Sequence, residues 1–154
     1  MILPKLNFPE TKFRFKESKS GSKQIFDSIR KKFVELTPEE WVRQHLIDYL
    51  INHKLVPISL ISVEKQLILN GTKRRTDIVI YNSTLQPIVI IECKAPNIQL
   101  SQATFNQAFG YNMVLNVPIL LLSNGLSHVC VHYINNEPII LSEIPDFDKM
   151  QNNF

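Results

Sequence analysis

Hydrophobic and polar residues alternate near the start of the chain. Charged residues separate phenylalanines between Lys12 and Lys16, and a second apolar run, Ile25-Phe26, follows a polar Ser-Gly-Ser turn. Alternation with a period of two is typical of a β-strand with one exposed face. Residues 1–36 are therefore predicted to form an N-terminal basic hairpin and extension that packs on the core.

Helical periodicity begins at Thr37. The Thr37 hydroxyl can cap a helix, Pro38 suits the first turn, and Glu40 stands three residues after the cap, where it can close a capping box. Four apolar residues then recur at helical spacing: Val42, Leu46, Tyr49 and Leu50. A helix is predicted from Thr37 to about His53, with this apolar stripe facing the core.

Short runs rich in isoleucine and valine come next. They span Ser62–Leu69, Thr76–Tyr81 and Ile88–Lys94, and the turn formers Asn70-Gly71 and Asn82-Ser83 separate them. This pattern favours three consecutive strands. The pattern ends with a helix near Ser101–Asn116 and strands at Pro118–Leu122 and His128–Ile134.

The order of these elements predicts an α/β fold with an αβββαβ core, in which helices flank a mixed central sheet. This core is expected to span residues 37–144. The tail, residues 145–154, is polar and is expected to be loosely held.

Composition is that of a soluble domain with one core, because 44% of the 154 residues are hydrophobic and no apolar run approaches the roughly 20 residues of a membrane span. The start lacks the basic and long apolar regions of a secretory signal, which favours a cytoplasmic location. Cys93 and Cys130 lie in apolar runs and are expected to be buried, free thiols.

The net charge of +3 conceals an asymmetry along the chain. Residues 1–32 hold nine Lys and Arg against three acidic residues, so the remainder is net acidic. The basic segment can meet phosphate, although a solvated face explains most individual lysines equally simply.

The run from Ile88 to Lys94 is a strongly apolar strand that ends in charges. Because strand side chains alternate, Glu92 and Lys94 share one face, and Asp77 can meet Glu92 if their strands pair. Two converging carboxylates make an oxygen-rich pocket suited to Mg²⁺, with Mn²⁺ as the expected substitute.

These residues resemble the PD-(D/E)XK nuclease superfamily, with Asp77 as the first acid and Glu92-Cys93-Lys94 as the acid-x-lysine element. Gln107 and Tyr111 match the Gln-x-x-x-Tyr motif of its RecB-like branch. The stretch from Pro38 to Gln44 is similar to the first helix of the N-terminal nuclease domain of type I restriction R subunits, in which Glu40 matches a glutamate that reaches the metal site.

The resemblance implies a Mg²⁺-dependent deoxyribonuclease. Its metal would be held by Asp77, Glu92 and the Cys93 carbonyl, helped by Glu40, while Lys94 activates or orients water. On a helix, Gln107 and Tyr111 would project together and support Lys94 or contact DNA. The residues expected to contact DNA are Lys73, Arg74, Arg75 and Arg43.

The sequence departs from these families at two points. Thr76 stands where the superfamily has proline, which removes no metal ligand. The helicase phosphate-binding loop of R subunits is missing, so the chain is not expected to be a complete subunit. A helicase or specificity subunit is an expected partner, and cutting both strands would need a homodimer or two successive events.

Other interpretations stay open. Glu40 can serve only as a helix cap, Tyr111 can simply pack, and Gln107 can face solvent. His128, Cys130 and His132 could bind zinc, but a partly exposed edge strand explains them better. The whole domain could bind nucleic acid in a larger assembly without cutting, or be structural, with Asp77 and Glu92 paired to cations.

Overall fold

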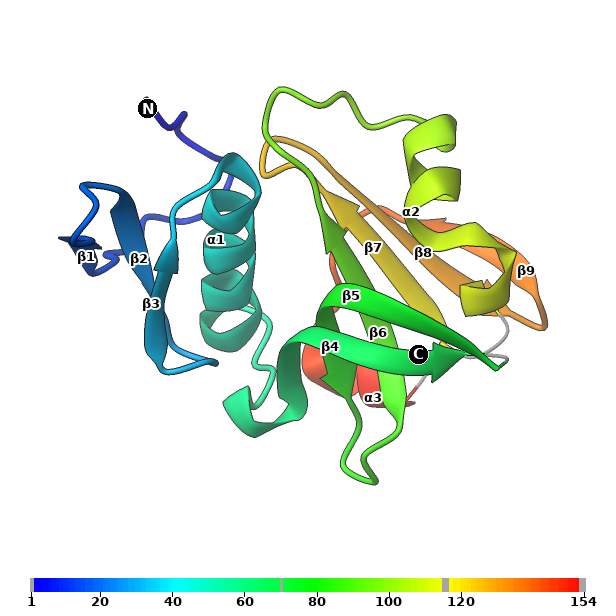
Figure 1. Ribbon diagram of the computed structural model, residues 1–154. Coiled ribbons are helices and arrows are strands. Elements are labelled where there is room, and N and C mark those ends of the chain that lie inside the picture. The colour runs from blue at the N-terminus through cyan, green and yellow to red at the C-terminus, as the bar shows by residue number, and fades with distance from the viewer. Residues whose placement is uncertain (1, 70, 115–116, 153–154) are drawn as a thin grey trace.

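The computed structural model describes residues 2–69, 71–114 and 117–152, which form two β-sheets and three α-helices (Figure 1). The small N-terminal sheet contains β1 (Phe15–Glu17), β2 (Lys23–Asp27) and β3 (Lys32–Glu35). The helices are α1 (Pro38–Asn52), α2 (Gln102–Val114) and α3 (Phe147–Asn152), and a short 3₁₀ turn, η1, spans Ile58–Leu60.

The large sheet has the strand order β4-β5-β6-β7-β8-β9. Its strands are β4 (Ile61–Leu69), β5 (Thr72–Tyr81), β6 (Pro87–Cys93), β7 (Ile119–Ser123), β8 (His128–Ile134) and β9 (Glu137–Leu141). Only β6 and β7 pair in parallel, because α2 connects them, and the other neighbours are antiparallel. The predicted αβββαβ core with a mixed sheet is confirmed.

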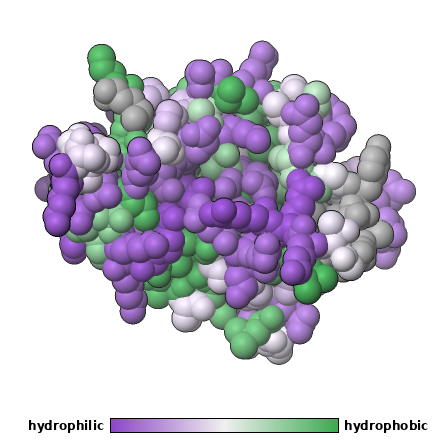
Figure 2. All heavy atoms as spheres, viewed as in Figure 1, coloured by the Kyte–Doolittle hydropathy of each residue, from purple (hydrophilic) through white to green (hydrophobic). Residues whose placement is uncertain are grey.

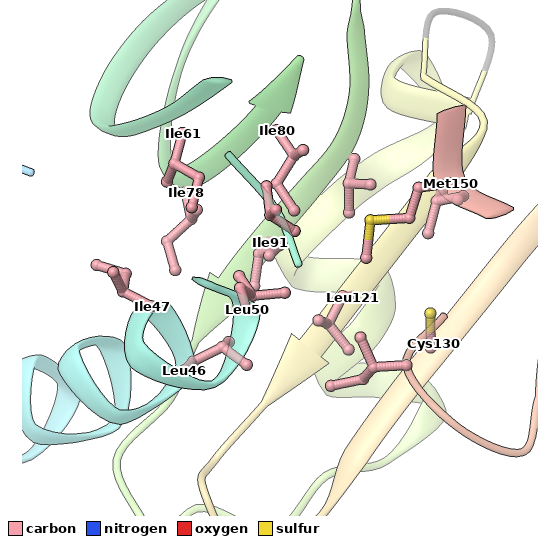
Figure 3. Close-up of a cluster of buried hydrophobic side chains, with 14 of the residues drawn as sticks. Leu46, Ile47, Leu50, Ile61, Ile78, Ile80, Ile91, Leu121, Cys130 and Met150 are labelled. Carbon is pink, nitrogen blue, oxygen red and sulfur yellow. The ribbon is translucent and has the colours of Figure 1, made fainter. Parts of the chain in front are cut away.

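Helices cover both faces of this sheet. One hydrophobic cluster joins α1 and α3 to one face, and it includes Leu46, Ile91 and Met150 (Figure 3). A second cluster packs Phe105 and Phe109 of α2 on the other face. Neighbouring residues of β6 point to opposite faces and both faces are covered, which explains why the strand is apolar from Pro87 to Ile91, before Glu92.

The N-terminal segment extends the predicted hairpin. β1 and β2 pair as expected, with Phe15 opposite Ile25, and β3 adds a third strand beside β2. In Figure 1, α1 lies between this small sheet and the large sheet. The small sheet is thus fixed to the same helix that carries Glu40 and Arg43.

Three expectations about the tail and the strands were wrong. In the predicted tail, residues 145–152 are not loosely held, because α3 buries Phe147 and Met150 in the core, and residues 153–154 lie outside the described residues. The strand β8 is not an edge strand, since β9 pairs with it. Lys73 to Arg75 precede the strand predicted at Thr76–Tyr81, but they belong to β5.

The α2 helix is broken at Gly110. The backbone of Gly110 has φ 62° and ψ −178°, a combination that is open almost only to glycine. The break lies between Gln107 and Tyr111, and the side chain of Tyr111 lies outside the described residues, so their predicted one-turn relation stays a prediction. Among the described residues, no helix is long and apolar enough to cross a membrane.

Candidate functional site

Asp77 and Glu92 face each other on neighbouring strands. The register pairs Val79 with Ile90 and Ile78 with Ile91, and its continuation sets Asp77 opposite Glu92. The two carboxyl groups are hydrogen-bonded, and the Cys93 backbone N–H donates to Asp77 Oδ2 at 2.7 Å. The structure thus brings together the first acid and the acid-x-lysine element, as the spacing predicted.

Glu92 is held in an environment that disfavours its charge. Burial, followed by the negative charge of Asp77 and the hydrogen bond with it, raises the pKa of Glu92 to about 9. The positive charges of Arg74 and Lys94 act in the opposite direction, which places both cations near this carboxyl group. At neutral pH the pair therefore holds a proton in the space between its oxygens.

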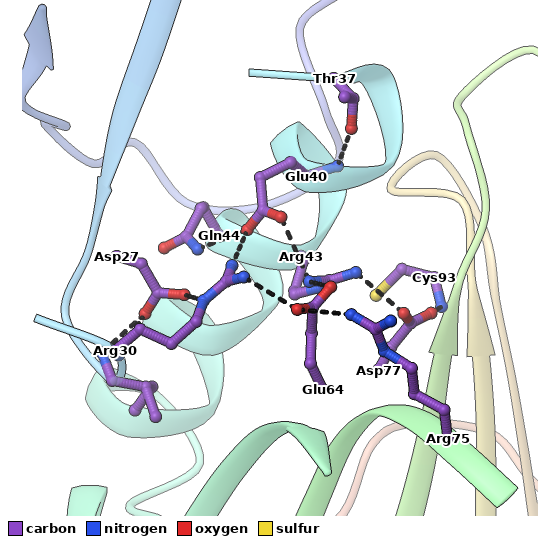
Figure 4. Close-up of polar contacts among 11 residues, drawn as sticks. Asp27, Arg30, Thr37, Glu40, Arg43, Gln44, Glu64, Arg75, Asp77 and Cys93 are labelled. Atoms are coloured by element: carbon purple, nitrogen blue, oxygen red, sulfur yellow. Dashed lines mark hydrogen bonds and ion pairs between the residues drawn. The ribbon is translucent and has the colours of Figure 1, made fainter. Parts of the chain in front are cut away.

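Arg43 lies at the centre of the carboxylates and is buried (Figure 4). Its Nη2 donates to Asp77 Oδ1 at 2.8 Å, and its Nη1 donates to Glu40 Oε2 at 3.2 Å and to Glu64 Oε1 at 3.3 Å. Although burial lowers the Arg43 pKa, these negative charges outweigh it and raise the pKa. Arg43 is thus a fixed counter-charge inside the domain, and its expected place on a DNA-facing surface was wrong.

Glu40 fulfils half of the predicted capping box. Its backbone N–H donates to Thr37 Oγ1 at 3.1 Å, so Thr37 is the N-cap of α1. The Glu40 carboxylate does not return to the cap: it accepts hydrogen bonds from Arg30, at 2.7 Å, and from Gln44, at 2.8 Å, in addition to Arg43. Binding a metal would require Glu40 to give up several of these bonds.

Glu64 is a member of this cluster that the sequence analysis missed. It lies on β4 between residues that pair with Ile78 and Thr76, which sets it beside Asp77. Its backbone has φ 51°, which is uncommon for a residue other than glycine. The turn former Asn70-Gly71 could have predicted this position. Residues at equal distances on either side of a hairpin turn pair with each other, which sets Glu64 opposite Asp77.

Three arginines surround the Glu64 carboxylate. Arg75 lies 2.8 Å away, and Arg43 and Arg30 lie 3.3 Å and 3.4 Å away. Burial would raise the Glu64 pKa, but the hydrogen bond with Arg75 and the charges of Arg43 and Arg30 lower it overall. Arg30 also pairs with Asp27, so one connected network joins the β2–β3 turn to α1, β4 and β5 (Figure 4).

The other predicted site residues lie around the Asp77–Glu92 pair. Lys94 directly follows β6, and its backbone N–H donates to Ser123 O at 2.8 Å. Gln107 is exposed on α2, and the side chain of Tyr111 lies outside the described residues. The roles predicted for these three residues stay predictions.

The basic residues of β5 have different surroundings. Arg74 Nη2 donates to the carbonyl oxygens of Gln107 and Ala108, which lie in the turn of α2 just before the break at Gly110. Arg75 pairs with Glu64 but its side chain is 68% exposed, and Lys73 is exposed. Arg74 therefore fastens α2 to β5, while Lys73 and Arg75 stay candidates for contact with DNA.

The Asp77–Glu92 pair suits a hard divalent cation. Two carboxylates that share a proton repel each other when both are charged, and a cation between them would remove that repulsion. Mg²⁺ commonly takes one or two protein carboxylates and keeps several waters. Among the described residues no group of three or more His, Cys, Asp or Glu is arranged to hold a metal, and the carboxylates that could contact a cation here are those of Asp77 and Glu92.

The alternating His128, Cys130 and His132 do not form a zinc site in the described structure. Cys130 packs in the core beside α1, and burial raises its pKa to about 12. His128 Nδ1 is 2.8 Å from Ser123 Oγ. Both cysteines are free and buried, as predicted.

A protein-family model matches most of the chain. The model described as "Type I restriction enzyme R protein N terminus (HSDR_N)" matches residues 38–146, which is more than half of the chain. The chain belongs to this family. The matched R-protein region begins at α1 and includes Glu40, Arg43, Asp77, Glu92 and Lys94, whereas the small N-terminal sheet precedes it.

A solved structure has the same fold as this R-protein domain. It is described as the fragment structure of a putative HsdR subunit of a type I restriction enzyme from Vibrio vulnificus YJ016, with a TM-score of 0.55 and 20% sequence identity. The match covers 75% of this chain and 24% of that chain, so the R-protein domain spans about a quarter of the length of this neighbour. A comparison with curated proteins gave no match.

Proposed function

We propose that this domain hydrolyses DNA phosphodiester bonds with the help of Mg²⁺. The observation that carries the proposal is the cross-strand pair of Asp77 and Glu92, two carboxyl groups set opposite each other with the positive charges of Lys94 and Arg74 acting on Glu92. Membership in the R-protein N-terminal family supports it, as does the fold shared with the HsdR fragment.

Each residue has a defined task in this reaction. Asp77 and Glu92 would hold the cation, with the Cys93 carbonyl as a third oxygen donor. A bound cation supplies positive charge to the phosphoryl oxygens and favours ionisation of water. Lys94 orients the attacking water and stabilises negative charge that develops on the phosphorus oxygens. Arg43 and the Cys93 N–H fix the orientation of the Asp77 carboxylate.

In-line attack is expected to leave a 5′-phosphate and a 3′-hydroxyl. The test uses supercoiled plasmid with Mg²⁺ or Mn²⁺ and the variants Asp77→Asn and Lys94→Ala, each confirmed to be folded. Nicking should depend on metal and disappear in both variants. Glu39→Gln is a matched control, because Glu39 is an exposed acid next to Glu40 and outside the cluster. A 3′-phosphate product, or nicking that persists in Asp77→Asn, would contradict the proposal.

A second candidate is a module that binds DNA and cuts only within a larger assembly, with a helicase or specificity subunit as partner. The ion pair between Arg43 and Asp77 favours it, because this pair must loosen before Asp77 can turn both oxygens to a cation. Intact plasmid with the isolated chain, and cutting after addition of the partner subunits, would distinguish this candidate from the first. Two domains would be needed to cut both strands at once.

A further inference from the structure

The small N-terminal sheet has two unlike faces. Its inner face buries Ile25 and Asp27 and brings Phe15 within 6.3 Å of the Trp41 ring on α1. Because strand side chains alternate, the neighbouring residues form the opposite, outer face. These outer residues are Arg14 and Lys16 beside or on β1, Gln24 and Phe26 on β2, and Phe33 and Glu35 on β3.

The outer face combines aromatic rings with cations. The rings of Phe26 and Phe33 are 5.2 Å apart, and the Arg14 guanidinium lies over the Phe26 ring at 4.0 Å. The Lys16 ammonium lies 4.5 Å from the centre of the Phe33 ring. Both cations are exposed and both rings are half-buried, so this face presents a flat, positively charged surface to solvent.

Further lysines surround the small sheet. Lys12, Lys19 and Lys31 are exposed before β1 or in the turns of the sheet, whereas Lys23 and Lys32 are exposed on the strands but alternate to the side that carries Phe15 and Asp27. In Figure 2, hydrophilic side chains dominate the part of the molecule where β1–β3 lie, with hydrophobic side chains among them. Cations around an aromatic surface match the two parts of a nucleotide, its phosphate and its base.

We propose that this outer face is a docking surface for single-stranded DNA. Unpaired bases stack on the Arg14 guanidinium, which lies over the Phe26 ring, and on the Phe33 ring when Lys16 turns from it to a phosphate. A duplex keeps its bases stacked inside, so it would use only the charges. The surface lies outside residues 38–146, and its binding does not depend on cutting at Asp77.

The position of the sheet relates this surface to the candidate site. Arg30, in the turn between β2 and β3, pairs with Glu40 and Glu64, and these acids contact Arg43, which pairs with Asp77. The sheet is therefore held to the same cluster that borders the Asp77–Glu92 pair. A strand bound on the outer face is kept on the domain that carries the proposed cutting site.

The experiment measures binding of a fluorescent oligothymidine by anisotropy in EDTA, so that no cutting occurs and failure of the proposed nuclease leaves the result unaffected. Arg14→Glu is expected to weaken binding at least about tenfold and to reduce the slope of log K against log salt by at least about 0.7. Phe33→Leu, which keeps an apolar side chain, should weaken binding about fivefold or more. The matched control Lys149→Glu reverses an exposed charge on α3 and should change affinity less than about twofold.

Three outcomes would overturn the proposal. Equal losses in Arg14→Glu and Lys149→Glu would indicate attraction by net charge alone. Duplex DNA bound as tightly as the oligothymidine would remove the preference for unpaired bases. Polyglutamate competing as well as the oligonucleotide, at equal charge, would indicate an acidic protein partner. Circular dichroism of each variant confirms that the small sheet is folded.

Discussion

Arg43 shows how a single buried charge organises the candidate site. It contacts carboxylates from α1, β4 and β5, whereas the guanidinium of Arg75 meets Glu64 from the solvent side. Buried ion pairs are costly to break from one side, because the remaining charges lose their partner. The position of this arginine therefore decides both the stability of the cluster and the orientation of Asp77.

Arg43→Met is expected to destabilise the fold by about 3–5 kcal/mol, because the buried Glu40 and the Asp77 carboxylate lose their shared counter-charge. Arg75→Ala is the control and should cost less than about 1 kcal/mol, since its ion pair is largely exposed. Urea unfolding followed by circular dichroism measures both values. Similar costs for the two variants would show that Arg43 is not the centre of the network.

Glu92 gives a prediction about pH. Its pKa is raised to about 9, mainly by burial and then by Asp77, so the folded chain retains a proton that the unfolded chain releases near the ordinary value of 4.5. The stability linked to this proton is fully present below pH 4.5 and is lost as pH rises through about 9. Glutamine does not titrate, so the Glu92→Gln variant does not lose stability through this group as pH rises.

In EDTA, Glu92→Gln should therefore gain stability over the natural chain as pH rises from 5 to 8, by up to about 1.4 kcal/mol for each pH unit. The measurement is the free energy of unfolding in urea at several pH values. Asp48→Asn provides a control, because Asp48 is a carboxylate on the far part of α1 from the cluster. A stability difference that is constant with pH would contradict the raised pKa.

At the scale of elements, α2 is attached to β5 next to its break at Gly110. Gly110 interrupts the helix, and the carbonyls of Gln107 and Ala108 just before it accept from Arg74 of β5. This pairing fixes α2 across the end of the sheet that carries Asp77. A regular helix from Ser101 to Asn116, as the apolar spacing suggested, would not provide these acceptors.

Gly110→Ala is expected to cost about 1–3 kcal/mol, because an L-residue is strained at φ 62° and ψ −178°. The added Cβ would have its nearest neighbour, Arg74 Nη1, at 3.9 Å, so the cost arises from the backbone and not from a clash. Gln107→Ala, on the exposed side of the same helix, should stay within about 0.5 kcal/mol of the natural chain. Thermal unfolding of the three proteins tests this, and equal stability of both variants would speak against the break.

At the scale of the whole molecule, the C-terminal residues close the core. The Phe147 N–H donates to Lys54 O at 2.8 Å, which ties α3 to the end of α1, and Met150 packs beside the large sheet (Figure 3). The small N-terminal sheet is joined to the other side of α1 through Arg30. The helix α1 thus contacts segments from both ends of the described chain.

Met150→Ala should destabilise the whole domain by about 2–5 kcal/mol, because it leaves a cavity in the main hydrophobic cluster. The adjacent Lys149→Ala changes an exposed side chain and should have almost no effect. Hydrogen exchange provides the measurement: protection of β6 should fall in the first variant and not in the second. Unchanged protection in Met150→Ala would mean that α3 is not part of the cooperative core.

The sequence by itself determined the elements of the core and the meeting of Asp77 with Glu92. Both follow from local rules, because helical and strand periodicities are written in consecutive residues and antiparallel pairing of β5 with β6 leaves little freedom of register. The motif residues also pointed to the R-protein family that the family model matches. These features depend on neighbours that are near in the chain.

Only the tertiary structure decided which charged side chains pair with each other. Arg43 and Arg30 meet carboxylates that lie from 3 to 34 residues away, and no local pattern states which partner each will choose. The burial of α3 was likewise hidden, because three apolar residues (Phe147, Met150 and Phe154) in an otherwise polar tail give too weak a pattern to predict a helix. Long-range packing set these features, since a buried charge or side chain adopts the partner that the whole fold brings to it.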